Sequence, residues 1–152
     1  MTLTQKETTL LSDLKSQEQL CIEKYTKYAE QACDPTLKNL FTTVKSTEEN
    51  HLSTICRIMN GEEVSMGASS SGSSSSVSQS TQSTCPQQSK DHDAFLCKDA
   101  LSMEKHVSSL YDTCIFEFSS PVLRNTLNHI QKEEQQHGEE LYRYMKNNNM
   151  YS

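Results

Sequence analysis

Apolar residues recur at steps of three and four along four stretches of the chain, which is the period of an α-helix with one buried face. These stretches run from about 4 to 33, 35 to 60, 92 to 119 and 121 to 148. Within each half, the two stretches meet at a proline that follows Asp or Ser, in CDPTLKNLF and SSPVLRNTL. A capping side chain followed by proline in the first turn is typical of a helix start. The pattern predicts an all-α protein of four helices.

A segment without apolar period separates the second stretch from the third. It covers residues 61–91, and eleven of the nineteen residues from 65 to 83 are serine. Such a composition is typical of a flexible linker. Gly61 is placed to end the preceding helix, and Asp91 and Asp93 are candidate N-caps for the next. We therefore expect one domain made of a helical hairpin (1–60), a Ser-rich crossover linker (61–91) and a second hairpin (92–152).

The two halves repeat one motif at an offset of 86 residues, since 134 − 48 = 86 and 137 − 51 = 86. Unrelated helices share an apolar phase easily, but they do not share a proline, two glutamates, a histidine and a tyrosine in one register. The sequence thus predicts an internal duplication of a helical hairpin. The matched pairs are Glu18 and Glu104, Tyr25 and Tyr111, Pro35 and Pro121, Glu48 and Glu134, His51 and His137, and Met59 and Met145.

The apolar stripe along each helix, which we call its seam, is interrupted at one level by acidic residues or histidine. The interruptions are Glu18 in the first helix, Glu48 and His51 in the second, Glu104 in the third, and Glu134 and His137 in the fourth. At about 1.5 Å per residue, the glutamate of the first helix in each hairpin lies roughly 25 Å from the proline turn. The Glu-x-x-His pair of the second helix lies roughly 20–24 Å from the same turn. All six side chains should therefore meet in one slice of the bundle.

Four buried carboxylates are strongly unfavourable without compensating charge. Two divalent cations would cancel the four charges, and oxygen with imidazole ligands suits iron or manganese. Two glutamates plus two Glu-x-x-His pairs form the di-iron carboxylate ligand set. A single Glu-x-x-His is usually only a solvated helix face, and a degenerate site that binds no metal remains an alternative. Tyr25 and Tyr111 are either core aromatics or functional residues, which would form hydrogen bonds to the ligands or quench radicals near the metals. Glu49 and Glu133 fall off the seam and are interpreted as surface charges.

Composition narrows the function classes. Only 34% of the 152 residues are hydrophobic and mean hydropathy is −0.71, so the core must be slim. A net charge of −6 argues against nucleic acid as a partner. We find no membrane-length apolar segment and no signal peptide, so a cytoplasmic protein is expected. The six cysteines contain no C-x-x-C pair and are interpreted mainly as buried reduced thiols, with Cys85, in the polar segment, able to cross-link.

The ligand arrangement Glu18, Glu48-x-x-His51, Glu104 and Glu134-x-x-His137 resembles the ferritin-like superfamily, rubrerythrins included. The second half is similar to the spore coat protein F family of endospore-forming bacteria. The stretches that carry this likeness are DALSMEKHVSSLYDTCIFE, PVLRNTL and EEQQHGEELYRYM, and the first half matches more weakly through DPTLKNLF. The resemblance implies a ferritin-like four-helix bundle that is incorporated into the spore coat. Because this sequence keeps both Glu-x-x-His motifs, it departs toward the metal-binding superfamily.

Two function classes follow. In the first, the protein is a structural coat component that associates with other coat proteins or with itself, a homodimer included, and retains two iron or manganese ions. In the second, it is a di-metal oxidoreductase acting on peroxide, dioxygen or ferrous iron, like a rubrerythrin, a ferroxidase or a manganese catalase. Without C-x-x-C, the chain lacks a rubredoxin-like module for electron delivery.

Overall fold

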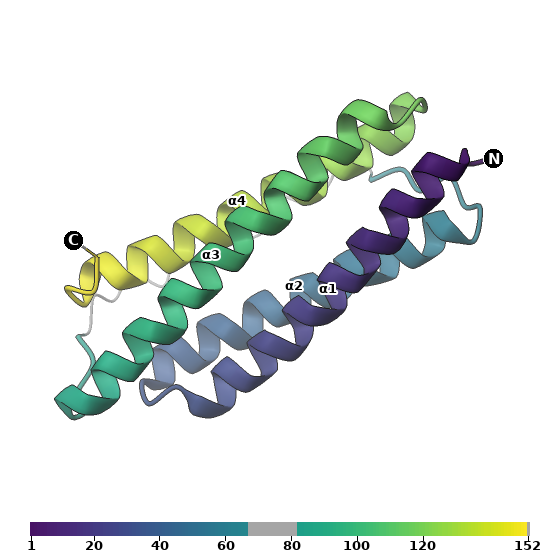
Figure 1. Ribbon diagram of the computed structural model, residues 1–152. Helices are drawn as coiled ribbons and strands as arrows, with labels where there is room; N and C mark the ends of the chain where they lie inside the picture. Colours follow the sequence, from purple (N-terminus) through teal and green to yellow (C-terminus); the bar gives the residue numbers. More distant parts are fainter. Residues whose placement is uncertain (67–81, 152) are drawn as a thin grey trace.

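The structure, a computed structural model, describes residues 1–66 and 82–151, and it is all-helical there, without strands. Four helices follow one another along the chain: α1 (Gln5–Gln31), α2 (Pro35–Met59), α3 (Gln87–Glu117) and α4 (Pro121–Asn147). They lie lengthwise beside each other (Figure 1). The prediction of four helices is therefore confirmed, and most of the boundaries lie within two residues of the predicted ones.

Local sequence explains most helix ends. Thr4 and Glu7 form a capping box at the start of α1. Asp34 and Ser120 accept hydrogen bonds from the first turns of α2 and α4, each just ahead of a proline. Gly61 ends α2 with a φ of 89°, a left-handed conformation that glycine adopts without a Cβ clash, as predicted.

The start of α3 differs from the prediction. The helix begins at Gln87, so residues 87–91 belong to it, and neither Asp91 nor Asp93 is its N-cap. Pro86 precedes the helix without a side-chain cap. Asp93 instead accepts the backbone N–H groups of Cys33 (2.9 Å) and Asp34 (3.1 Å) in the turn between α1 and α2. The serine-rich stretch 67–81 of the predicted linker lies outside the described residues.

The cysteine prediction needs one correction. Cys33 and Cys85 form a disulfide, which joins the α1–α2 turn to the residues just before α3. Cys21, Cys97 and Cys114 are buried free thiols in the core, as their helical phase indicated. Burial raises the pKa of Cys97 to about 12 and that of Cys114 to about 11, so both remain protonated at neutral pH.

The packing pattern is a ring of helices. α1 packs against α2 and α3, and α4 packs against α3 and α2. α2 ends at one end of the bundle, and α3 starts at the other (Figure 1). One apolar core runs along the axis and is built from all four helices. No helix in the described ranges is both long and apolar enough for a membrane crossing.

Candidate metal centre

All six predicted ligands lie together in the middle of the core. Each is buried, with at most 5% of its surface exposed: Glu18, Glu48, His51, Glu104, Glu134 and His137. They reach this slice because each sits at a seam position of its helix, where an apolar residue would otherwise be. The sequence pattern had anticipated this convergence from the distances to the two proline turns.

The side chains form two overlapping clusters, in each of which the potential ligand atoms lie within 4.8 Å of one another. Glu18 and His51 belong to the first cluster, and Glu104 and His137 belong to the second. Glu48 and Glu134 belong to both. A carboxylate has two oxygens, so these two glutamates are placed to face two ions at once.

The carboxylates are crowded and poorly paired. His51 Nδ1 lies 3.0 Å from Glu48 and 3.2 Å from Glu134, and His137 Nδ1 lies 3.2 Å from Glu48. Although some of these atoms are close, several buried ones make no well-oriented hydrogen bond with the described residues: Glu18 Oε2, Glu48 Oε1, Glu104 Oε2, both carboxylate oxygens of Glu134, and His137 Nδ1. Buried polar atoms are rarely left without partners, so this slice has the coordination capacity that a cation needs.

The pKa values of these side chains show how crowded the carboxylates are. Burial raises the pKa of Glu18 and Glu104 well above the usual range, and neighbouring carboxylates add to the effect. Burial alone lowers the pKa of His51, but the surrounding carboxylates, Glu133 first, outweigh it and raise this pKa to about 12. Carboxylates also raise the pKa of His137 well above its usual range. Glu18, Glu104 and both histidines thus keep their protons to higher pH than they would in water.

Two tyrosines connect the hairpins at this slice. The Tyr25 hydroxyl donates a hydrogen bond to Glu104, and the Tyr111 hydroxyl donates one to Glu18. Each bond thus joins a helix of one hairpin to a glutamate of the other. Of the two interpretations of these tyrosines, the structure favours the hydrogen-bonding one, although both rings are also fully buried in the core.

The interpretation of Glu133 as a surface charge was wrong. Its Oε2 atom lies 2.7 Å from His51 Nε2, and its side chain is only 29% exposed. Glu133 lies next to a seam residue, and a long side chain can reach inward from that position. His129, one turn earlier on α4, lies 3.3 Å from the other oxygen of Glu133. The offset of 86 would have exposed the difference, because the counterpart of Glu133 is Thr47.

Comparison with known proteins gives one match. The family model described as Coat F domain matches residues 92–152, which comprise α4 and most of α3. No curated protein and no solved structure matches the chain. The resemblance noted for the second half is thereby confirmed, and the match is confined to that half of the chain.

Proposed function

We propose that this chain is a component of the bacterial endospore coat whose helical bundle holds two divalent metal ions, iron or manganese. The coat assignment is supported by the Coat F match over residues 92–152. The metal assignment is supported by one observation above others: two four-residue clusters of buried ligands share Glu48 and Glu134. The donor set fits, since oxygen and imidazole ligands suit iron and manganese.

The residues divide naturally between two ions. Glu18 and His51 would hold one ion, Glu104 and His137 would hold the other, and Glu48 and Glu134 would bridge them. Two divalent cations would balance the four carboxylate charges, and the carboxylate oxygens and imidazole nitrogen that lack hydrogen bonds could hold them. Such a pair of ions supplies Lewis acidity and, for iron or manganese, redox chemistry. Tyr25 and Tyr111 hold Glu104 and Glu18 in orientation through their hydroxyl groups.

We infer that the fold is a ferritin-like bundle of two duplicated hairpins. The supporting contacts are reciprocal at the offset of 86. Tyr25 contacts Glu104 and Tyr111 contacts Glu18, where 25 + 86 = 111 and 18 + 86 = 104. A second reciprocal pair lies at the bundle ends: Asp93 accepts the backbone N–H of Cys33, and Glu7 accepts that of Ser119. Here too 7 + 86 = 93 and 33 + 86 = 119.

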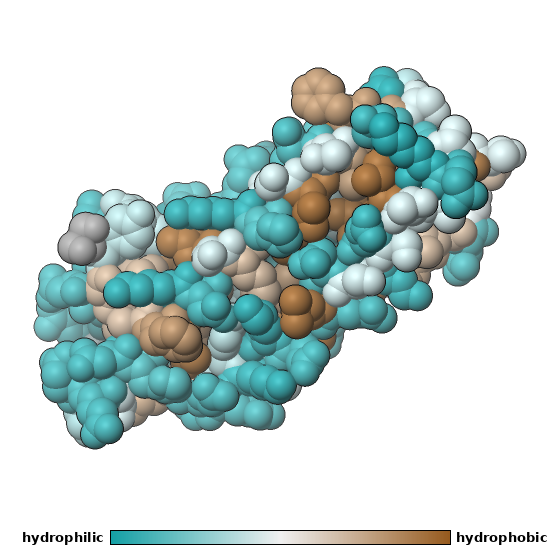
Figure 2. Space-filling view, viewed as in Figure 1, coloured by the Kyte–Doolittle hydropathy of each residue, from teal (hydrophilic) through white to brown (hydrophobic). Residues whose placement is uncertain are grey.

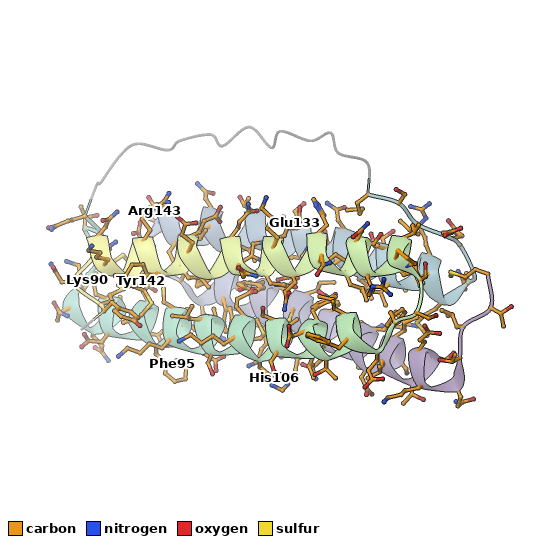
Figure 3. All side chains as sticks on the ribbon, turned by 90° about the horizontal axis from the view of Figure 1, so that it is seen from above. Lys90, Phe95, His106, Glu133, Tyr142 and Arg143 are labelled. Atoms are coloured by element: carbon orange, nitrogen blue, oxygen red, sulfur yellow. A yellow bond between two sulfur atoms is a disulfide. The ribbon has the colours of Figure 1, made fainter. Side chains whose placement is uncertain are left out.

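Contacts with other coat proteins or with further copies of this chain fit the surface. Phe95 and Phe116 on α3 are 62% and 84% exposed, and Tyr151 near the C-terminus is 47% exposed. The face in Figure 2 is largely hydrophilic, with separate apolar areas. Phe95 points away from the bundle (Figure 3). Exposed aromatic rings of this kind are enriched at protein interfaces.

A redox function is the second candidate, and the tyrosines favour it. Each buried hydroxyl is hydrogen-bonded to a carboxylate of the centre, which is where a side chain that donates an electron and a proton to a bound oxidant would lie. In that case the protein acts on peroxide, dioxygen or ferrous iron. An enzyme, unlike a structural component, should turn over these substrates when loaded with manganese or iron. Tyr25→Phe should abolish this turnover and leave the metal content unchanged.

Metal content tests the site. The purified chain, loaded anaerobically with iron or manganese, should contain about two ions. Glu134→Ala should lose both because it removes a shared ligand, and His137→Ala should lose at least one. Glu139→Ala, which changes an exposed glutamate on the same helix, is the control. Absence of bound metal in the loaded wild-type protein contradicts the di-metal proposal.

Location tests the coat assignment separately. We expect the protein in the coat fraction of purified spores, and the two metal-site variants should be incorporated there as well if the role is structural. Detection only in vegetative cells would contradict a coat component and would leave the metal result standing.

A further inference from the structure

The two histidines of the centre differ in what faces their outer ring nitrogen. His51 Nε2 lies 2.7 Å from Glu133 Oε2, and Glu133 is in turn 3.3 Å from His129. Within the described part of the chain, we find no hydrogen bond to Nε2 of His137. The His51 side chain is 1% exposed, whereas that of His137 is 7% exposed. The half of the centre that contains His51 is therefore covered by Glu133, and the half that contains His137 is more exposed.

The difference originates in a local break of the repeat. The counterparts of Glu133 and His129 are Thr47 and Thr43, since 133 − 86 = 47 and 129 − 86 = 43. Over His51, α4 thus places a long acidic side chain backed by an imidazole. Over His137, α2 offers only two short hydroxyl side chains. A threonine at position 47 is too short to reach His137 as Glu133 reaches His51.

A pocket lies at this less covered position. It has a volume of about 110 Å³ and is lined by Thr43, Val44 and Thr47 of α2 and by Glu133, Gln136, His137 and Glu140 of α4. A water molecule occupies about 30 Å³ in the liquid, so the pocket has room for several waters. Figure 3 shows Glu133 near the middle of α4, along its edge toward α2. Apart from Val44 the lining residues are polar, and Glu133 and Glu140 give the pocket two carboxylates that attract cations.

We propose that the centre is asymmetric: a hydrated divalent cation enters and leaves through the Thr47 pocket at the His137 half, while Glu133 closes and stabilises the His51 half. This inference rests on the proposed di-metal centre. Glu133 acts here as a positioning residue. Its bond to Nε2 fixes the ring of His51 so that Nδ1 faces the ligand carboxylates, 3.0 Å from Glu48.

The asymmetry predicts unequal binding of the two ions. Removing the hydrogen-bond partner of a metal-bound histidine typically lowers metal affinity about 10- to 100-fold. The His51 half has such a partner, and among residues 1–66 and 82–151 the His137 half has none. The ion at the His51 half should therefore bind more tightly and dissociate more slowly. Loss of manganese to excess chelator from the fully loaded protein should show two phases of about one ion each.

Reciprocal substitutions test this assignment. Thr47→Glu should place a carboxylate over His137 and slow the fast phase at least about 10-fold, and Glu133→Thr should accelerate the slow phase by a similar factor. Thr42→Glu is the matched control, since Thr42 is exposed on α2 and adds the same charge outside the pocket lining. Circular dichroism checks folding, and Thr47→Gln replaces Thr47→Glu if the added charge is not tolerated. When Thr47→Glu and Glu133→Thr are combined, the ion at the His137 half should dissociate in the slow phase and the ion at the His51 half in the fast phase. Adding His137→Ala to this double variant identifies which phase belongs to the His137 half.

The outcomes separate the two proposals. Release of both ions in one phase, or a fast phase that Thr47→Glu and Thr47→Gln leave unchanged, overturns the Thr47 entry route while the di-metal centre stands. If Thr42→Glu slows the fast phase as much as Thr47→Glu does, the change is due to general surface charge, and this result also overturns the Thr47 entry route. Failure of the wild-type protein to bind two ions removes the di-metal centre and this inference together.

Discussion

Two buried polar regions of this bundle, the α1–α2 turn and the central slice, differ in how their carboxylates are hydrogen-bonded. At the α1–α2 turn, Asp93 is fully buried and accepts two backbone N–H groups, and Asp34 accepts the Tyr144 hydroxyl at 2.6 Å. In the central slice, four buried glutamates face one another, and five of their oxygen atoms have no hydrogen-bond partner among the described residues. The first region satisfies its charges with the protein's own donors. The second leaves coordination capacity that a cation would fill.

The contrast shows that buried acid alone does not indicate a metal site. Asp34 and Asp93 are as deeply buried as the central glutamates, yet their role is to fix the turn and the start of α3. What marks the central slice is the shortage of donors together with the sharing of Glu48 and Glu134 between two clusters. The two regions should therefore respond differently to pH, to amide substitution and to metal.

The largest difference should appear in pH dependence. In chelator, His51 and His137 keep protons in the folded protein at pH values where the unfolded chain, with a pKa near 6.5, has lost them. Folded protein then binds more protons than unfolded protein, so stability falls as pH rises above about 6.5, by up to about 1.4 kcal/mol per pH unit for each histidine. For His51 this loss continues to its folded pKa of about 12.

Urea unfolding between pH 6.5 and 9 measures this slope. With saturating manganese the slope should flatten or reverse, because metal binding requires unprotonated histidines. Asp93→Asn, a substitution at the α1–α2 turn outside the centre, is the comparison variant and should keep the slope that the two histidines produce. A metal-free protein whose stability is independent of pH over this range contradicts the electrostatic description of the centre.

The disulfide should matter next. It links residues 52 apart in sequence and holds the α1–α2 turn beside the start of α3. In the chain-entropy model, closing a loop of this length stabilises the folded state by about 4 kcal/mol. Cys33→Ser with Cys85→Ser should lower the free energy of unfolding by that order, with metal binding retained. Cys56→Ser, at a half-buried free thiol, is the control. Equal stabilities of the double variant and the oxidised wild type would argue against this tether.

Replacing a carboxylate by its amide should destabilise the turn. In Asp93→Asn, one oxygen becomes an NH₂ group that faces a backbone N–H, so a buried donor loses its acceptor at a cost of about 1–3 kcal/mol. The effect should be the same with and without metal. Asp91→Asn, an exposed change two residues away, should be nearly neutral. Chemical denaturation of the three proteins in chelator gives the comparison.

The same chemical change should act the other way in the centre. Burial, with Glu48 and Glu134 beside it, raises the pKa of Glu18, so its ionised form is disfavoured in the folded metal-free protein. Glu18→Gln removes that cost and keeps an acceptor for the Tyr111 hydroxyl. Metal-free stability at pH 8 should rise by about 1 kcal/mol, roughly the free energy of one pKa unit. Stabilisation by manganese should decrease in the same variant. A loss of metal-free stability would show that the centre tolerates its charges unaided.

Sequence reasoning succeeded where one periodic signal carried the information. The four helices, the end of α2 at Gly61 and the convergence of the six predicted ligands all follow from apolar phase and from distance to a proline. It failed where tertiary contacts decide. Residues 87–91 have no apolar period, yet they extend α3 beside the Cys33–Cys85 disulfide, and cysteine pairing cannot be read from spacing alone. Glu133 was missed because reach, rather than phase, brings it to His51.

Anomalous X-ray diffraction from crystals of the manganese-loaded protein tests the di-metal centre most directly. We expect two peaks in the central slice, both within about 2.0–2.6 Å of oxygens of Glu48 and Glu134, with one near His51 and the other near His137. No peak in that slice, or peaks only at exposed carboxylates such as Glu139 and Glu140, would contradict a di-metal centre in this protein.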